Sequence, residues 1–85
     1  MSTWHVYLLR CSDDTLYTGI STDTEKRLVC HNAGKGAKYT RSRLPVKLVW
    51  QETAASESIA RKREIELKRW TRTQKLALIR SGKQA

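Results

Sequence analysis

Two tyrosines, Tyr7 and Tyr17, stand ten positions apart near the start of the chain, and Arg27 and His31 follow at a four-residue spacing. Phenol and imidazole groups are able to move protons, and a guanidinium group is able to hold an anion. Ordinary packing of a small core does not require this set of polar side chains. Their types and spacing therefore mark a candidate active site.

The two tyrosines belong to a predicted β-hairpin. Residues 3–11 and 15–20 are rich in β-branched, aromatic and aliphatic side chains, and a Ser-Asp-Asp turn run separates them. Side chains alternate between strand faces, so a turn with an odd residue count pairs Tyr7 with Gly19 and puts both tyrosines on one face. An even count would separate Tyr7 from Tyr17. The alternative is that both are simply good strand formers with one edge in water.

Residues 21–33 predict a helix of about three turns. Its Thr-Asp-Thr-Glu run at 22–25 has the spacing of a capping box, and Gly34 suits the position just past the C-terminus. Arg27 and His31 then lie on one face, because residues four apart are neighbours on a helix. The glycine at the end of the hairpin, Gly19, lets this helix or a bound backbone approach the sheet closely.

The segment 34–45 is predicted to be a flexible basic loop. Lysine and arginine interleaved with an aromatic ring suit contacts to phosphate together with base stacking. A solvated loop without a binding role is the alternative. The candidate nucleic-acid-binding residues are Lys35, Lys38, Tyr39, Arg41 and Arg43.

Residues 46–53 alternate apolar and polar side chains, which predicts a third strand with Val46, Leu48 and Trp50 on one face and a wetter face opposite. A helix over 56–70 is expected to follow, with Ser56 as its N-cap. Its predicted core stripe consists of Ile59, Ala60, Leu67 and Trp70.

Glu64 falls about 40° from Ala60 on that helix, at the shoulder of the core-facing stripe, whereas Glu66 projects to the far side. Basic side chains, among them Lys68, surround Glu64 on the helix. Two interpretations stay open for this carboxylate. It forms a salt bridge within the helix, or it binds a metal ion.

The chain of 85 residues has room for one domain, expected to span 1–85. A second capping box, formed by Thr71 and Gln74, predicts a last helix that runs to Gly82, and residues 83–85 are expected to fray.

The scattered Cys11 and Cys30 are expected to be free thiols. Without a leader or a long apolar run, a reducing cytoplasm is the expected location.

Lysine and arginine number 17 against 8 acidic residues, which leaves a net charge of +9. Such a charge attracts polyanions, because binding to a phosphate backbone releases condensed counterions. Nucleic acid is therefore the expected partner. The alternatives are a charge that merely favours solubility, or a membrane surface as partner. The mixed distribution of basic residues argues against the membrane.

These residues together resemble the GIY-YIG nuclease superfamily, and the whole length is similar to its small stand-alone bacterial branch, the YhbQ-like proteins. The segment AKYTR at 37–41 also resembles the corresponding loop of Slx-type structure-specific nuclease subunits. The resemblance extends from Trp4 to about Ile79. It rests on VY at 6–7, YTG at 17–19, Arg27, His31 and Glu64, in that order.

The resemblance implies an α+β fold, a three-stranded antiparallel sheet flanked by helices, and divalent-metal-dependent hydrolysis of a phosphodiester. Tyr7 and Tyr17 would orient or deprotonate the attacking water, and His31 would assist that proton relay. Arg27 would stabilise charge on the phosphate. Glu64 would hold a single Mg²⁺ or Mn²⁺.

Two departures from the family pattern stand out. His5 occupies the place of a glycine in the first motif, and the only asparagine is Asn32, whereas some family nucleases have one after the metal-binding glutamate. The expected activity is a metal-dependent endonuclease on structured or single-stranded DNA, with RNA as the other substrate. The second hypothesis is a catalytically weak or inert nucleic-acid-binding module. For so small a chain, a partner protein or a homodimer would supply further specificity.

Overall fold

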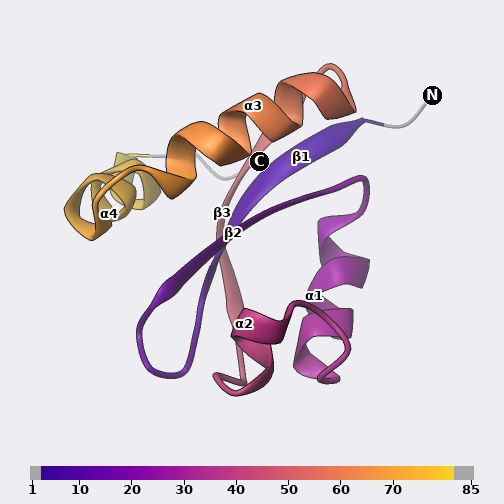
Figure 1. Ribbon diagram of the computed structural model, residues 1–85, viewed down its shortest axis with the longest axis vertical. Coiled ribbons are helices and arrows are strands. Elements are labelled where there is room, and N and C mark those ends of the chain that lie inside the picture. Colours follow the sequence, from indigo (N-terminus) through magenta and orange to yellow (C-terminus); the bar gives the residue numbers. More distant parts are fainter. Residues whose placement is uncertain (1–2, 82–85) are drawn as a thin grey trace.

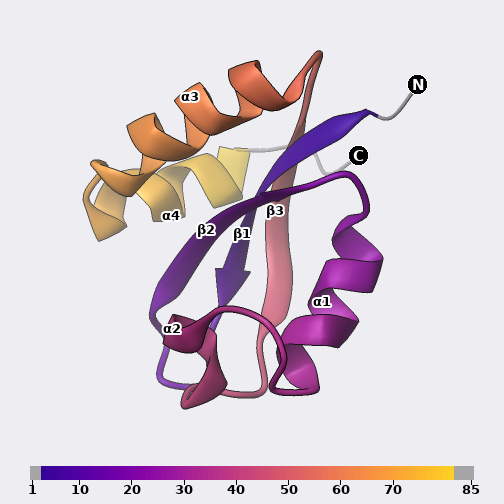
Figure 2. The same cartoon turned by 45° about the vertical axis from the view of Figure 1, so that its right-hand side comes forward.

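The structure, a computed structural model, describes residues 3–81. The fold is α+β, as predicted, with an antiparallel sheet in the order β2-β1-β3. Helices α1 and α2 lie against one face of the sheet, and α3 and α4 lie against the other in both views (Figures 1 and 2). The elements are β1 (Trp4–Arg10), β2 (Leu16–Ser21), α1 (Thr24–Asn32), α2 (Lys38–Arg41), β3 (Lys47–Ala54), α3 (Glu57–Lys68) and α4 (Arg72–Ser81).

The hairpin of β1 and β2 has the predicted odd register. Tyr7 pairs with Gly19 and Leu9 pairs with Tyr17. The turn is held by the Asp13 carboxylate, which accepts hydrogen bonds from the Thr15 amide at 3.1 Å and the Thr15 hydroxyl at 2.6 Å. Tyr7 and Tyr17 therefore share the sheet face that α1 and α2 cover.

A register shift between β1 and β3, with Val49 as the extra residue on β3, changes the faces of β3. The shift falls between Leu8, which pairs with Trp50, and Leu9, which pairs with Leu48. As a result, Trp50 packs with α3 and α4, while Leu48 packs on the Tyr7 side. The predicted common face of Val46, Leu48 and Trp50 was wrong, because the extra residue of a bulge rotates the strand relative to strict alternation. Both faces of β3 are consequently packed.

Helix α1 begins one residue later than the predicted capping box requires. Asp23 is the N-cap, and its carboxylate accepts a hydrogen bond from the Lys26 amide at 3.0 Å. The prediction of a Thr22–Glu25 box was wrong because the next residue, Asp23, has the extended N-cap backbone and its carboxylate accepts from a free amide of the first turn. Gly34 follows the helix with φ +78, as predicted for the position past the C-terminus.

Helix α3 has the predicted N-cap, since the Ser56 hydroxyl accepts from the Ile59 amide at 3.2 Å. Ala60 and Leu67 are fully buried, but Ile59 is 50% exposed, so its predicted place in the core was wrong. Ile59 lies 100° around the helix from Ala60 and turns away from the sheet.

Among residues 3–81, no helix is long and apolar enough to cross a membrane.

Helix α4 opens with the predicted capping box. The Gln74 amide donates to the Thr71 hydroxyl at 3.2 Å, and the Thr71 amide donates to the Gln74 side chain at 2.8 Å. The predicted end at Gly82 and the predicted fraying of residues 83–85 lie outside the described residues.

Candidate active site

His31 is the centre of the site and is fully buried on α1. Its Nε2 atom lies 3.2 Å from the Tyr7 hydroxyl, and its Nδ1 atom lies 2.9 Å from the Thr40 hydroxyl. Strand β1 supplies Tyr7 and the short helix α2 supplies Thr40, so three separate elements fix one imidazole ring. The result is a buried hydrogen-bond chain from Tyr7 through His31 to Thr40.

The hydrogen bonds of Thr40 set the proton positions in this chain. Its hydroxyl donates to the Ala37 carbonyl at 2.9 Å, so its oxygen accepts from Nδ1–H of His31. The Nε2 atom then carries the lone pair and accepts the Tyr7 hydroxyl proton. The opposite tautomer would use the longer 3.4 Å contact from the Ala37 amide to Nδ1. This arrangement makes His31 a proton acceptor for Tyr7.

Both tyrosine rings meet the His31 ring edge to face. The centroid separations from His31 are 6.3 Å for Tyr7 and 5.4 Å for Tyr17. Two glycines make room for this packing. A Cβ atom on Gly19 would lie 2.5 Å from the Tyr7 hydroxyl, and one on Gly36 would lie 2.3 Å from His31 Nδ1. Neither position has space for a side chain while the rings keep these places.

Burial controls the acid–base properties of the pair. It raises the pKa of Tyr7 to about 12, although the Arg27 guanidinium acts in the opposite direction. Burial, and then the charge of Arg27, lowers the pKa of His31. His31 is consequently neutral near pH 7 and free to accept a proton. Tyr7 is not ionised there, so its hydroxyl keeps its proton near neutral pH.

Arg27 is half-buried on α1, one turn before His31. Its Nη1 atom lies 3.8 Å from the Cys30 sulfur, and its charge acts on both Tyr7 and His31. It also lines a surface hollow of about 220 Å³ with residues of the start of α1. The guanidinium therefore stands between solvent and the buried proton chain, as a contact to a phosphate would need.

Glu64 comes from α3, on the other side of the sheet from α1. Its side chain is 17% exposed, which confirms the predicted shoulder position, and Glu66 is 54% exposed. The Glu64 carboxylate lies 3.4 Å from the Lys68 ammonium. Its charge contributes to the raised pKa of Tyr7. In the described part of the chain, no three metal-ligating side chains come together, so Glu64 is a single candidate ligand.

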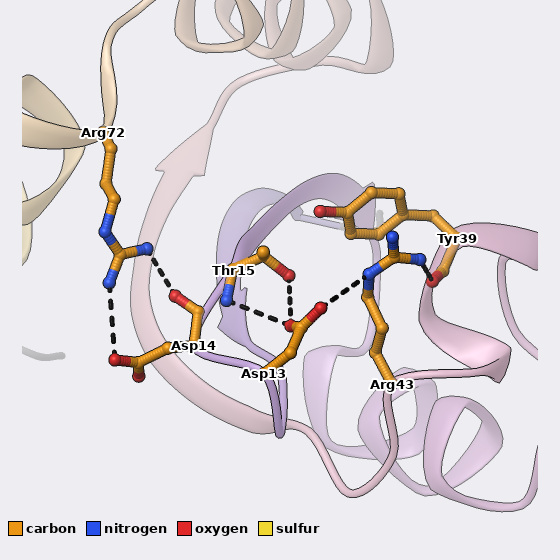
Figure 3. Close-up of polar contacts among 6 residues, drawn as sticks. All are labelled: Asp13, Asp14, Thr15, Tyr39, Arg43 and Arg72. Carbon is orange, nitrogen blue, oxygen red and sulfur yellow. Dashed lines mark hydrogen bonds and ion pairs between the residues drawn. The ribbon is translucent and has the colours of Figure 1, made fainter.

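The segment predicted as a flexible loop contains α2, so that prediction was wrong for its centre. Arg43 donates to the Asp13 carboxylate at 3.0 Å and to the Tyr39 carbonyl at 2.8 Å (Figure 3). Its guanidinium also lies 4.0 Å from the centre of the Tyr39 ring, which stacks against Tyr17. These contacts occupy ring surface that a stacked base would need. Of the predicted contacts to nucleic acid, Arg43 is half-buried, and the exposed ones are Lys35, Lys38, Tyr39 and Arg41.

Residues 3–77 match the family model described as the GIY-YIG catalytic domain. The chain belongs to the GIY-YIG family. Within it, the chain is similar to the small UPF0213 proteins, the YhbQ-like group. UPF0213 protein SH2523 of Staphylococcus haemolyticus is 52% identical over 93% of this chain and 96% of the relative. UPF0213 protein H16_B0156 of Cupriavidus necator is 51% identical over 89% and 83%.

Two solution structures of similar proteins show the same fold. The UPF0213 protein BH0048 of Bacillus halodurans is 42% identical with a TM-score of 0.58, covering 91% of this chain and 82% of that one. The protein EF2693 of E. faecalis is 37% identical with a TM-score of 0.64, covering 95% and 86%. At these identities the likeness supports both the fold and the family.

One departure from the GIY-YIG pattern has a structural explanation. The Asn32 side chain accepts from the Val46 amide at 2.8 Å and donates to the Val46 carbonyl at 3.1 Å. Asn32 therefore fastens the end of α1 to the start of β3 and does not stand in for an asparagine beside Glu64. His5 has a buried Nδ1 atom without a hydrogen-bond partner among the described residues.

Sequence reasoning missed two residues of this GIY-YIG site, Thr40 and Gly36. Both lie in the segment interpreted as a basic loop, where the charges drew attention away from a hydroxyl and a glycine. The Gly-Lys-Gly run at 34–36 was the available signal, because a second glycine beyond the helix end has no capping role. Their function depends on a contact with His31 that spacing along the chain does not reveal.

Replacing Thr40 by valine is expected to destabilise the fold by about 1–3 kcal/mol, because Nδ1–H of His31 loses its buried acceptor. The remaining polar partner of Nδ1 is the Ala37 amide, which favours the other tautomer. Urea unfolding measures the first effect, and imidazole ¹⁵N chemical shifts measure the second. Thr40→Ser should restore both. Unchanged His31 shifts in Thr40→Val would show that Thr40 does not set the tautomer.

Proposed function

We propose that this protein is a divalent-metal-dependent hydrolase of nucleic acid phosphodiester bonds that acts on structured or single-stranded DNA. The observation that carries the proposal is the buried chain from Tyr7 to a neutral His31 whose tautomer is set by Thr40. Membership of the GIY-YIG family and the net charge of +9 support the same reaction and substrate class. We place the reaction in the cytoplasm.

Tyr7 would take a proton from the attacking water as its own proton passes to Nε2 of His31. The resulting hydroxide would form the new bond to phosphorus as the bond to the leaving oxygen breaks. That oxygen would take a proton from solvent water, and the proton held on His31 would return to solvent through the Tyr7 hydroxyl. This relay does not require a free phenolate, which the raised pKa of Tyr7 disfavours. Tyr17, packed against the same imidazole ring, would orient the water.

Arg27 would stabilise the negative charge that builds up on the phosphate oxygens. Such stabilisation is strong in a partly buried site, where the surroundings screen charge less than water does. Arg27 is already placed close enough for its charge to affect the Tyr7 hydroxyl. The same guanidinium would therefore contact the phosphate beside the hydroxyl that handles the water proton.

The residues present fit a metal ion held by one carboxylate. Mg²⁺ commonly binds through one or two carboxylates and completes its shell with water and substrate phosphate oxygens. Glu64 would be the protein ligand, and the ion would neutralise charge on the scissile phosphate. Lys68 now lies beside that carboxylate, so the ammonium would have to turn away when a cation binds.

The proposal is tested by incubating the purified protein with branched, flapped, single-stranded and fully paired DNA, and with RNA, in Mg²⁺ or Mn²⁺. Metal-dependent cleavage of structured or single-stranded DNA is the expected result. Omission of the cation is the matched control. Tight binding of these substrates without any cleavage in either metal would contradict the hydrolase proposal.

One observation favours the second hypothesis, a nucleic-acid-binding module with weak or no catalysis. Tyr7 is 2% exposed and His31 is fully buried, so the proton chain has almost no surface open to substrate water. The ion pair with Lys68 also competes with any metal at Glu64. The cleavage assay separates the two hypotheses, since a binding module retains substrate without converting it.

A further inference from the structure

A groove runs along β2 beside the candidate active site. It consists of a hollow of about 320 Å³ and an adjoining hollow of about 170 Å³, which share Leu16 and Lys75. Tyr17 lines the larger hollow and also packs against His31, so the groove begins at the site. The larger hollow is lined by Leu16, Tyr17, Thr18, Tyr39, Lys68 and Lys75.

The charged residues that line this groove are all basic, and one of them, Lys68, is paired with Glu64. Neither hollow is lined by an acidic residue, and Arg72 joins Lys75 in the smaller one. Arg72 is already paired with Asp14 of the hairpin turn (Figure 3). Lys75 is half-buried, and between residues 3 and 81 no carboxylate lies within ion-pair distance of its ammonium. Burial, and then the charge of Lys68, lowers the pKa of Lys75, a cost that a bound anion would remove.

We propose that this groove binds the phosphodiester backbone of a single nucleic acid strand that leads away from the bond to be cleaved. Lys75 and Lys68 would contact phosphates, and the ring edges of Tyr17 and Tyr39 that line the groove would contact the sugars. Positive grooves with aromatic walls are the usual form of single-strand sites. The inference rests on the proposed function, because it assigns the groove to the substrate of that site.

A second observation points to a ligand in the groove. Thr18 lines it and is 3% exposed, and its hydroxyl oxygen has no hydrogen-bond partner in the part of the chain that the structure describes. A buried hydroxyl without a partner is costly. A phosphate oxygen or its bound water in the groove would satisfy it. The groove differs from the predicted basic loop, since its lysines come from α3 and α4.

The test measures binding without cleavage, by fluorescence anisotropy of labelled oligothymidylate and oligouridylate in EDTA. The double variant Lys68→Gln, Lys75→Gln is expected to bind about tenfold more weakly than a matched control with two exposed lysines replaced, Lys47→Gln and Lys62→Gln. Both variants lose the same charge. For each phosphate that the protein no longer neutralises, the slope of log affinity against log salt should become shallower by about 0.7.

Equal weakening in the two double variants would overturn the groove assignment, because a general loss of charge would then explain it. Equal weakening for a fully paired duplex and for the single strands would also overturn the single-strand assignment. Comparison of oligothymidylate with oligouridylate shows whether DNA or RNA fits better. If strand binding depends on Lys75 but the protein cleaves none of the substrates, the proposed hydrolase function is refuted and the groove assignment stands. If the protein cleaves its substrate and Lys75→Gln changes neither cleavage nor binding, the groove assignment is refuted and the hydrolase function stands.

Discussion

Replacing Tyr7 by phenylalanine is expected to slow phosphodiester cleavage by about 10²–10⁴-fold, the usual contribution of a positioned proton-transfer group. The change deletes one hydroxyl and keeps the ring that packs against His31 and over Gly19. Without that hydroxyl, the water proton has no path to Nε2 of His31. Single-turnover cleavage with saturating protein measures the effect free of substrate affinity.

Thr73→Val is the control for this experiment. It also deletes one hydroxyl, from an exposed residue of α4 that lines neither hollow of the groove. The control should cleave at nearly the rate of the unmodified protein. If Tyr7→Phe retains full single-turnover activity, the proton relay through His31 is wrong, whatever the fate of the metal proposal.

The same relay predicts the acid side of the pH–rate profile. His31 must be neutral to accept a proton, and burial and Arg27 place its pKa below the usual 6.5. The kcat/KM value should therefore hold down to pH 6.5 and fall below it, as pH drops through the lowered pKa. Arg27→Gln should move that fall to higher pH. A fall centred above pH 6.5 in the unmodified protein would contradict the relay.

Folding stability is expected to fall in the same pH range and has to be measured beside the rate. The unfolded chain binds a proton at His31 near pH 6.5, before the folded chain does, so acid favours unfolding between that value and the lowered pKa. Urea unfolding at each pH separates this loss from the loss of catalysis. Rates are then compared only where the protein remains folded.

Glu64→Gln is expected to reduce cleavage by at least about 10³-fold, because the metal ion loses its only protein carboxylate and with it the stabilisation of the phosphate charge. Glu66→Gln is a close control on the same helix, since Glu66 also forms an ion pair, with Arg63 at 2.9 Å. That variant loses the same charge and a similar salt bridge. It should retain cleavage.

Binding of Mn²⁺, followed by electron paramagnetic resonance, gives a second measure of the Glu64 variant that does not depend on activity. Glu64→Gln should weaken Mn²⁺ binding, whereas Lys68→Gln should strengthen it, because the ammonium that competes for the carboxylate is removed. If both variants bind Mn²⁺ as the unmodified protein does, Glu64 belongs to a salt bridge alone. The helix interpretation left open by the sequence would then be the correct one.

Local patterns predicted the hairpin and the first helix well, for a physical reason. Strand alternation and helical periodicity are properties of neighbouring residues, so the odd turn placed Tyr7 and Tyr17 on one face, and four-residue spacing aligned Arg27 with His31. The same reasoning put Glu64 at the edge of a buried surface. The roles of these residues in cleavage stay predictions until the assays above are done.

Where patterns failed, a contact between distant segments had decided the outcome. A bulge within β3, at Val49, moved Trp50 and Leu48 to opposite faces, and strict alternation does not allow for this. The supposed loop formed α2, because Thr40 and Gly36 pack against His31. Both errors concern segments whose conformation is fixed by the rest of the fold.

The sequence by itself therefore predicted the family from short motifs, and the fold class from that resemblance. It also named Tyr7 and His31 as candidates for the proton relay, but not Thr40. Only the tertiary structure decided the tautomer of His31 and the partner of Glu64. It also created the groove in which Lys68 and Lys75 meet Tyr17. Burial and hydrogen-bond partners arise when α1, α2, α3 and α4 close on the sheet, and these interactions set the chemistry of the site.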